Sequence, residues 1–526
     1  MAQALKETNA TQNPHQVADQ TEVEQLLSAP STYGPNIDYI DRVDTYGAML
    51  FMTPDRVIKV KKAVKYPYMD FSTLEKRRAA CFNEIKLNRP TAPSIYIGVC
   101  AVARQSDGSL ALVRDGLEAD KADIIEWGVE MHRFDEDQRL DHLAERHVLT
   151  DQMLLTLSDK VAEFHAGAPI YREEPDFFSA MQKIIRENTD AFREFPTIFS
   201  SARVDTMTGH LDDWMARKQT VFQTRQEKGY IRHCHGDLHL ANLVCVDGEP
   251  TLFDALEFDD NMARIDVAYD LAFLLMDLLE RGHGRSANLV FNRYLSATSD
   301  LSAVSLLPLY LSVRAAIRAK IAAAENDHSA AETYFRFAEK FLAHHEPVLV
   351  AIGGLSGTGK STVAREVASF VGAPPGAVVL RSDVLRKQIF DVSETETLPS
   401  SAYTEDTSQR VYDLLHEKAA EVLSYGQSVI MDAVYHRPKE REVAQKVAAT
   451  HQASFFGIWL EAPPPTLKAR VDSRTGDASD ADARVVVRQL DYDVGVVTWS
   501  NVLTDAPLET VAQRVKSLLP LNELQY

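Results

Sequence analysis

The chain has 526 residues, of which 45% are hydrophobic and 25% charged, and its formal net charge is −20 at pH 7. This length exceeds what one hydrophobic core usually organises, so we expect two or three globular domains. The negative charge argues against general binding to nucleic acid or to anionic membranes, because both are themselves polyanions. Small molecules or proteins are therefore the expected partners.

The cysteine content and the amino terminus predict the compartment. The four cysteines form no CxxC pair and are sparse for this length, so neither a disulfide framework nor a zinc ribbon is expected. The first twenty residues contain no apolar stretch typical of a signal peptide, and no apolar run approaches the length of a membrane span. The sequence therefore predicts a cytoplasmic protein with reduced thiols and no membrane segment.

The first predicted elements after a polar arm are a hairpin and a helix. Residues 1–20 are poor in apolar side chains and are predicted to be disordered. Short apolar runs at 48–52 and 57–61, separated by a turn at 53–55, predict the hairpin. The helix is predicted over residues 72–88, with Ser72 as its N-cap, Glu75 three residues later and Pro90 beyond its end.

Beyond residue 130 the pattern becomes mainly helical. A small hairpin is predicted from the apolar runs 243–246 and 251–253, on either side of Asp247 and Gly248. Two long helical patterns cover about 302–324 and 329–344, and a buried strand follows at 348–352. Strands and helices then alternate to the end, which predicts a parallel sheet. We place a domain boundary near Glu346, giving domains at 21–346 and 347–526.

The strongest motif follows the strand at 348–352 and opens a helix. The motif is Gly-x4-Gly-Lys-Ser, and its glycines let consecutive backbone N–H groups curl around phosphate oxygens, which side chains at those positions would obstruct. Lys360 is expected to bridge the β- and γ-phosphates of ATP, and Ser361 to hold magnesium. The predicted ATP-binding residues are Gly354, Leu355, Ser356, Gly357, Thr358, Gly359, Lys360, Ser361 and Thr362.

Three charged residues near the ends of later strands predict phosphate transfer to an acceptor. Asp383 could take a proton from an acceptor hydroxyl, and Arg386 could orient acceptor or transition-state oxygens. A helix cap and a surface charge are the structural alternatives for this pair. Asp432 ends an apolar strand at 428–432 and is a candidate magnesium ligand of the Walker B type.

Four arginines in a polar stretch could form a lid over the phosphates. Arg470 and Arg474 are the candidates for contact with substrate or transition state, and Arg484 and Arg488 follow them; exposed helix charges are the alternative. The segment 347–526 resembles P-loop kinases of the polynucleotide kinase, gluconate kinase and zeta-toxin type, in which an Asp-x-x-Arg follows the P-loop. This resemblance implies kinase activity without fixing the acceptor.

A second motif, His-Gly-Asp-x4-Asn, spans residues 235–242. In this spacing Asp237 can accept the proton of an acceptor hydroxyl while Asn242 helps to hold magnesium. Asp254 follows the predicted hairpin and is the expected main magnesium ligand. Zinc binding by His233, His235 and His239 is an alternative that lacks supporting cysteine pairs, and we expect His235 to brace the loop instead.

Residues upstream of this motif predict an ATP site of the kinase kind. Lys59 lies at the end of a predicted strand and Glu84 in the helix that follows, the order in which a strand lysine holds phosphates and a helix glutamate orients it. Lys61 is an alternative because it shares the face of Lys59, and a solvated strand edge remains a third interpretation. Residues 126–131 are predicted to be a hinge between two lobes.

Residues 1–346 resemble the aminoglycoside phosphotransferase branch of the protein-kinase-like fold. The stretches 69–78 and 253–258 further resemble a bacterial group of bifunctional phosphotransferase and ATP-binding proteins, fused in this order. The resemblance implies a multidomain α/β protein: a two-lobed α+β kinase-like domain followed by an α/β/α P-loop kinase domain with a parallel sheet. It also implies that Asp270 ties down the catalytic loop. A Gly-x-Gly-x-x-Gly phosphate loop is missing, and only Gly47 lies near the first strand.

The predicted function is ATP- and Mg²⁺-dependent phosphate transfer to small hydroxyl compounds at two nucleotide sites, without nucleic acid or membrane as a partner. Two alternatives stay open. One half could be an active kinase and the other a nucleotide-sensing module, or the protein could be a toxin-like or protein-modifying kinase. A shared fold does not select the substrate, so aminoglycosides are not inferred from the resemblance.

Overall fold

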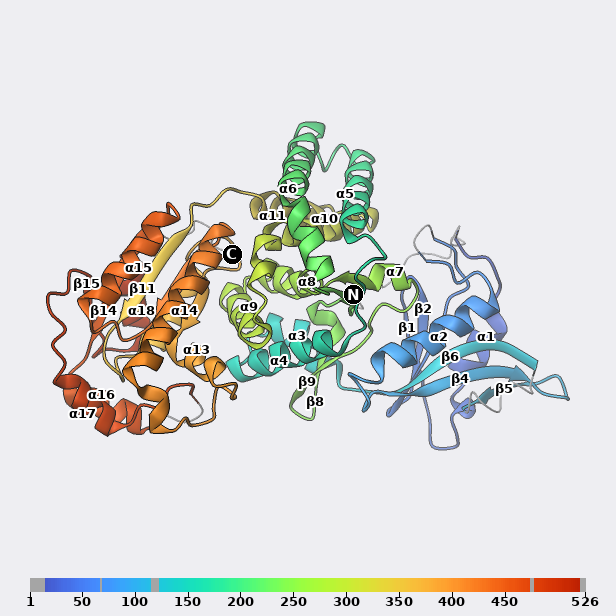
Figure 1. Ribbon diagram of the computed structural model, residues 1–526. Coiled ribbons are helices and arrows are strands. Elements are labelled where there is room, and N and C mark those ends of the chain that lie inside the picture. The colour runs from blue at the N-terminus through green and yellow to red at the C-terminus, as the bar shows by residue number, and fades with distance from the viewer. Residues whose placement is uncertain (1–14, 67–68, 115–122, 474–476, 521–526) are drawn as a thin grey trace. The chain divides into compact units, whose positions relative to one another are not determined.

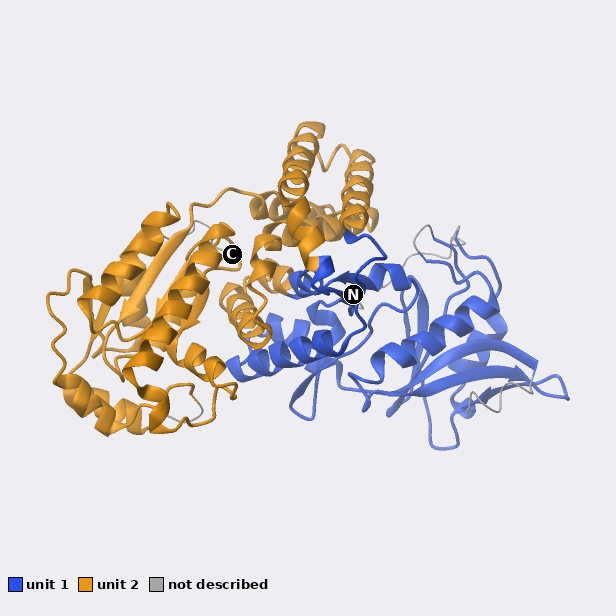
Figure 2. Ribbon diagram, in the orientation of Figure 1, with its two compact units in different colours: residues 1–177, 226–274 blue, residues 178–225, 275–526 orange. Residues whose placement is uncertain are grey.

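The structure is a computed structural model that describes residues 15–66, 69–114, 123–473 and 477–520 (Figure 1). The chain forms two compact units (Figure 2). Unit 1 comprises Met1–Phe177 and Gln226–Leu274, and unit 2 comprises Phe178–Arg225 and Leu275–Tyr526.

Unit 1 contains a six-stranded antiparallel sheet in the order β1-β2-β3-β6-β4-β5. The predicted hairpin is confirmed, because Ala48 of β2 pairs with Lys61 of β3 and Met52 with Val57. The strands are β1 (Asp41–Asp44), β2 (Ala48–Met52), β3 (Arg56–Lys61), β4 (Tyr96–Arg104), β5 (Leu110–Val113) and β6 (Asp123–His132).

Helix α2 (Leu74–Asn88) packs on this sheet and begins slightly later than predicted. Its N-cap is Thr73, whose side chain accepts a hydrogen bond from the backbone N–H of Lys76 at 3.3 Å. Ser72 is not the cap: it donates its own backbone N–H to Asp70 at 3.0 Å. Cys81 of α2 is buried in one apolar cluster with residues of β4 and β6, which fixes the helix against the sheet.

Residues 15–20, at the end of the predicted disordered arm, are ordered and contact residues of the sheet and of the turn after β3. Residues 1–14 lie outside the described residues, whereas Val17 donates its backbone N–H to the carbonyl of Ala63 at 2.8 Å. The buried Gln20 side chain donates to the Lys61 carbonyl at 2.9 Å and to the Glu126 carboxylate at 2.8 Å. Residues 15–20 are therefore ordered by polar contacts that composition alone does not reveal.

The predicted hinge at residues 126–131 is wrong. These residues lie inside β6, which pairs with β3 on one side and β4 on the other. Glu126 is buried and receives Arg77 Nε at 2.8 Å. Because Arg77 neutralises the buried Glu126, the strand continues to His132.

The remainder of unit 1 surrounds the His-Gly-Asp motif. The predicted second hairpin is confirmed as β8 paired with β9, and β7 pairs with β10. The elements are α1 (Thr21–Ser28), α3 (Leu140–Glu145), α4 (Asp151–Gly167), β7 (Ile231–His233), β8 (Leu243–Val246), β9 (Glu249–Leu252), α7 (Asp260–Ala263), β10 (Arg264–Asp266) and α8 (Val267–Glu280), which continues into unit 2.

Unit 2 contains long helices and a parallel sheet. The helical pattern predicted from residue 302 begins with a 3-10 turn at Leu301–Ser305, and the second predicted helix is confirmed. The helices are α5 (Phe177–Arg193), α6 (Ser201–Glu227), α9 (Gly284–Thr298), α10 (Leu307–Ala324) and α11 (His328–Phe341), of which α5 and α6 each extend by one or two residues into unit 1.

The predicted parallel sheet is confirmed, with five strands in the order β12-β13-β11-β14-β15. Helices α12 and α18 contact each other beside the sheet, and α14 contacts α15. The elements are β11 (Val348–Gly353), α12 (Lys360–Ala368), β12 (Val378–Arg381), α13 (Ser382–Ile389), α14 (Glu405–Ser424), β13 (Val429–Asp432), α15 (Pro438–Thr450), β14 (Ser454–Glu461), α16 (Pro464–Asp472), α17 (Ala483–Leu490), β15 (Ser500–Leu503) and α18 (Leu508–Lys516).

Helix α9 contacts the edge strand of this sheet within unit 2. Asn292 Oδ1 accepts the backbone N–H of Val379 at 2.6 Å, and Asn288 donates to the Ala377 carbonyl at 3.1 Å. Because such contacts place α9 and the parallel sheet in the same unit, the domain boundary near Glu346 stays a prediction. The fold class is as predicted, with an α+β part that has an antiparallel sheet followed by a P-loop part that has a parallel sheet.

The predictions about the cysteines and about membrane segments can be compared with the described residues. All four cysteines are free thiols. Among the helices that the structure describes, none combines the length and the apolar character needed to cross a bilayer.

Candidate active sites

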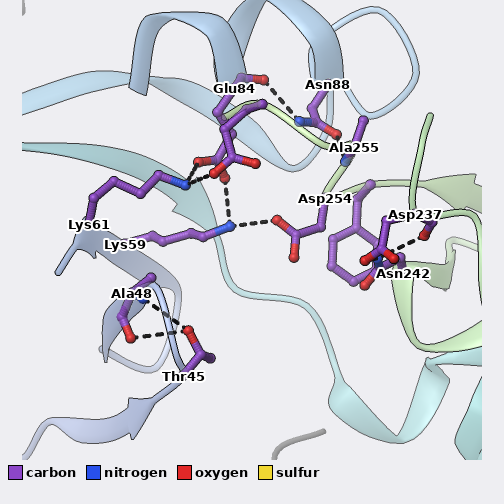
Figure 3. Close-up of polar contacts among 12 residues, drawn as sticks. Thr45, Ala48, Lys59, Lys61, Glu84, Asn88, Asp237, Asn242, Asp254 and Ala255 are labelled. Atoms are coloured by element: carbon purple, nitrogen blue, oxygen red, sulfur yellow. Dashed lines mark hydrogen bonds and ion pairs between the residues drawn. The ribbon is translucent and has the colours of Figure 1, made fainter. Parts of the chain in front are cut away.

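The first site is built around Lys59, whose side chain joins residues far apart in the sequence (Figure 3). Lys59 Nζ lies 2.9 Å from Glu84 Oε1 and 2.5 Å from Asp254 Oδ1. Burial alone would lower the pKa of Lys59, but the carboxylates of Asp254 and Glu84 outweigh it and raise that pKa well above its ordinary value. The predicted strand lysine, helix glutamate and metal-ligating aspartate therefore lie together, with the lysine charged.

Asp254 is held in an unusual backbone conformation, with φ +59°. Its N–H donates to the Tyr96 hydroxyl at 3.1 Å, and the next N–H, of Ala255, donates to Asn88 Oδ1 at 2.8 Å. A non-glycine residue persists in this region only when its surroundings impose it. These two bonds fix the direction of the Asp254 carboxylate.

The loop at residues 235–242 brings Asp237 and Asn242 together as their spacing predicts. Asn242 Nδ2 donates to Asp237 Oδ2 at 2.8 Å and to the Asp237 carbonyl at 2.9 Å. Asn242 forms a 3-10 turn with Leu240 and is buried, whereas Asp237 is partly exposed. The loop therefore presents an oriented carboxylate toward solvent, where an acceptor hydroxyl can reach it.

Asp270 holds this loop, which confirms its predicted structural role. Its two carboxylate oxygens accept the backbone N–H groups of His235 at 3.0 Å and Gly236 at 2.9 Å. His165 Nε2 lies 3.1 Å from the same carboxylate. Gly236 has φ +80°, and a Cβ there would lie 3.0 Å from Leu256 Cβ, so glycine suits the turn.

Asp270→Ala is expected to destabilise unit 1 by about 2–4 kcal/mol, because it leaves two buried backbone N–H groups without an acceptor. Urea unfolding of the variant and of the parent measures this difference. Asp212→Ala, at an exposed position in α6, is the control and should change the free energy of unfolding little. Equal stability of the Asp270 variant and the parent would contradict the structural role.

The predicted alternative of zinc at three histidines finds no support. His235 Nε2 lies 2.9 Å from the Phe253 carbonyl, so His235 braces the loop as expected, and burial lowers its pKa. Among the described residues, the one group with metal-ligand proximity is His165, Cys234 and Asp270, and the oxygens of Asp270 already accept backbone N–H groups.

The residues of the first site fit a magnesium nucleotide. Asn242 and Asp254 offer the amide and carboxylate oxygens that Mg²⁺ prefers, and Lys59 offers an ammonium group for phosphate oxygens. Where a glycine-rich loop is missing, the chain makes a tight turn before β2, in which Thr45 Oγ1 accepts the N–H of Ala48 at 3.0 Å.

The second site begins where β11 ends. Gly354, Gly357 and Gly359 have φ values of +139°, +85° and +88°, and α12 starts at Lys360. A Cβ at Gly357 would lie 2.5 Å from the Leu467 carbonyl oxygen. Backbone conformation and close approach therefore both require glycine at Gly357, as expected for a loop that curls around phosphate.

Gly357→Ala is expected to remove nucleotide binding at the second site and to lower stability. The left-handed conformation costs a residue with a side chain about 1–2 kcal/mol, and the contact with the Leu467 backbone adds to this cost. Thermal unfolding with and without Mg-ADP measures both effects. The variant should show a lower melting temperature and no ligand shift from this site, whereas Gly426→Ala, where a Cβ meets nothing within 4 Å, should keep the ligand shift.

The predicted magnesium ligands of the second site are in contact. Ser361 Oγ donates to Asp432 Oδ2 at 2.5 Å, and Asp432 is the last residue of β13. Lys360 Nζ donates to the Leu355 carbonyl at 3.1 Å, on the same loop. The Ser361 hydroxyl at the start of α12 and the Asp432 carboxylate at the end of β13 fit Mg²⁺, and Lys360 is within the loop that would surround the phosphates.

A cavity of about 1060 Å³ opens next to this loop. Its walls include the predicted acceptor residues Asp383 and Arg386 and the P-loop from Ser356 to Val363. Burial raises the pKa of Asp383, and Arg381 opposes this effect only in part. Arg386 is buried, donates to the Ala402 carbonyl at 2.8 Å and lies 4.8 Å from the Tyr403 ring centroid. The pair is therefore neither a helix cap nor a surface charge.

The arginines predicted to form a lid differ in position. Arg470 lines the cavity and donates to the Gly357 carbonyl at 3.4 Å and the Thr504 carbonyl at 2.7 Å. Arg484 and Arg488 also line it, and Arg484 is exposed. Arg474 lies outside the described residues.

Four residues of this site were missed by sequence reasoning. Arg381 lies between two acids, with Asp477 at 2.6 Å and Asp432 at 3.5 Å. Asp480 forms an ion pair with Lys387, in which Lys387 Nζ lies 2.7 Å from Asp480 Oδ2, although 93 residues separate them in the sequence. Arg381 ends a strand just before the Asp-x-x-Arg motif, and this position could have identified it as a site residue. Asp477 and Asp480 lie in a polar stretch whose sequence does not distinguish them from other surface acids.

Comparison with known proteins finds a family match near the carboxy-terminal end and relatives along most of the chain. Residues 349–493 match the family model described as an AAA domain. An uncharacterized protein of Mycobacterium tuberculosis (strain ATCC 25618 / H37Rv) is 29% identical over 474 residues, which cover 87% of this chain and 91% of that protein. An uncharacterized protein of Mycobacterium bovis shows the same values.

Solved structures resemble each part separately. The GDP complex of wild-type aminoglycoside 2'-phosphotransferase-IIIa covers 62% of this chain and 99% of its own, with 15% identity and a TM-score of 0.37. A sugar kinase from Janibacter sp. HTCC2649 covers 33% of this chain and 94% of its own, with 19% identity and a TM-score of 0.26. The P-loop at residues 354–361 lies within the segment that matches the AAA domain model.

Proposed function

We propose that the protein is an ATP-dependent phosphotransferase with two nucleotide sites, each of which transfers the γ-phosphate to a hydroxyl group of a small molecule in the cytoplasm. One observation carries this proposal. In each site a lysine for phosphate and oxygen ligands for Mg²⁺ accompany a carboxylate placed to receive a proton: Lys59 with Asp237, and Lys360 with Asp383.

The proposed reaction is the same at both sites. The acceptor oxygen forms a bond to the γ-phosphorus while the bond from that phosphorus to the β,γ-bridging oxygen breaks, and ADP leaves. Asp237 or Asp383 takes the proton of the acceptor hydroxyl. Mg²⁺, held by Asn242 and Asp254 or by Ser361 and Asp432, would supply neutralisation of phosphate charge. Lys59 and Lys360 would orient phosphate oxygens, and Arg386 would face the acceptor.

Transfer at the second site is expected to fall at acidic pH. A carboxyl group accepts a proton only when it is ionised, and burial raises the pKa of Asp383 above the ordinary aspartate value. The rate should therefore rise with pH through that raised value and level off above it. A pH–rate profile of the Asp237→Ala variant isolates this site, and a rate that stays constant down to the ordinary pKa of aspartate would argue against Asp383 as the base.

The acceptors can be sought directly. The intact protein, Asp237→Ala and Lys360→Ala are each incubated with ATP labelled at the γ-phosphate and an extract of small metabolites. The proposal predicts labelled products from the intact protein, of which one set disappears with each variant. If one variant removes all products and the other changes only their amount, one half is a nucleotide sensor. Label on protein, with none on small molecules, would contradict small-molecule transfer.

A further inference from the structure

A second buried lysine lies beside Lys59 and pairs with a carboxylate that the proposed chemistry does not use (Figure 3). Lys61 is on the same strand, and its side chain is 2% exposed. Its ammonium group lies 2.6 Å from Glu84 Oε2 and also contacts Glu257 Oε1. The Glu257 side chain is 9% exposed. The region therefore contains two buried lysines and not the single one of the predicted motif.

The two lysines share Glu84. Lys59 contacts Glu84 Oε1 and Lys61 contacts Glu84 Oε2, so each carboxylate oxygen faces one ammonium group. A buried ammonium group needs a compensating charge, because it has lost its hydration. Without Glu257, Lys61 would depend on Glu84 alone and would compete with Lys59 for it. Burial would raise the pKa of Glu84, but the two lysines lower it to about 2.

Glu257 belongs to the same short segment as Asp254, and helix α2 holds this segment at two points. Asn83 donates to the Glu257 carbonyl at 2.6 Å, and Asn88 accepts the N–H of Ala255 at 2.8 Å. The segment 254–257 thus carries both Asp254, which pairs with Lys59, and Glu257, which pairs with Lys61. A change in the second contact would shift the first.

We propose that Glu257 is a positioning residue of the first nucleotide site. Through its pair with Lys61 it leaves Glu84 available to orient Lys59, and it fixes the segment that carries Asp254. This inference rests on the proposed binding of nucleotide at the first site. It assigns Lys61 to support of the site and Lys59 to contact with phosphate.

The test measures nucleotide binding by calorimetry in the Lys360→Ala background, which weakens the second site. Mg-ADP reports on Lys59 and Asp254, and adenosine reports on the rest of the same site. Glu257→Gln should raise the dissociation constant for Mg-ADP about 10- to 100-fold, as loss of a group that orients a ligating residue does. The dissociation constant for adenosine should stay within about twofold, which also shows that the variant is folded. Glu75→Gln, exposed on α2, is the matched control and should bind both ligands like the parent.

A double variant separates positioning from general support of the fold. Lys61→Met together with Glu257→Gln removes both charges and leaves Glu84 to Lys59 alone, so it should bind Mg-ADP more tightly than Glu257→Gln by itself. Parent-like binding by Glu257→Gln, or a double variant that is no better than the single one, would overturn the inference. If the parent with Lys360→Ala binds neither ligand, the proposed first site itself is wrong, and the inference falls with it.

Discussion

Lys360→Ala is expected to lower phosphate transfer by the second site by at least about 100-fold, because it removes the cation that would neutralise charge on the transferring phosphoryl group. The surrounding loop should keep its shape, since its three glycine positions and the start of α12 at Lys360 depend on backbone conformation. The measurement is the rate of formation of those labelled products that remain in Asp237→Ala.

Lys446→Ala is the control for this prediction. Lys446 is exposed on α15 and does not line the cavity, so its removal changes the charge of the unit without touching the loop. The control should retain the parent rate. A Lys360 variant that also retains it would show that the second site does not transfer phosphate by the proposed chemistry.

Asp237→Asn is expected to lower transfer by the first site about 100- to 10,000-fold, the usual contribution of a positioned base. The amide has nearly the same shape as the carboxylate, so the contact with Asn242 can adjust while the ability to take a proton is lost. Product formation in the Lys360→Ala background measures the first site alone. Mg-ADP binding should persist, since Lys59 and Asp254 are unchanged.

Asp212→Asn, exposed on α6, is the matched control and should leave the rate unchanged. A parent-like rate for Asp237→Asn together with normal nucleotide binding would remove Asp237 from the reaction. Loss of both binding and transfer would indicate a structural role for Asp237, which contradicts its assignment as the base.

Local patterns were enough to predict much of the fold. The hairpin β2–β3 and the parallel sheet follow from short apolar runs, whose periodicity depends only on neighbouring residues. The P-loop is equally local, because its glycines are required by the backbone of a single turn. Lys59, Glu84 and Asp254 were predicted from their order along the chain, and the structure brings them together.

Buried charges limited the prediction. Lys61 could not be distinguished from Lys59 by sequence because its carboxylate partner Glu257 lies 196 residues further along the chain. The predicted hinge is instead part of β6, where Arg77 neutralises Glu126 inside the sheet. Thr73 and Ser72 are both good N-caps, and the choice between them is made by the hydrogen bond from Ser72 to Asp70. The partners of Lys61 and Glu126 are set by tertiary structure, whereas the choice of cap depends on a contact two residues away.

ATP turnover by the double variant Asp237→Ala/Lys360→Ala tests the two-site account most directly. The intact protein, both single variants and the double variant are compared with labelled ATP and the extract in which the intact protein forms products. The account predicts partial and complementary loss of products in the single variants and complete loss in the double variant. Unchanged turnover in the double variant would contradict the account.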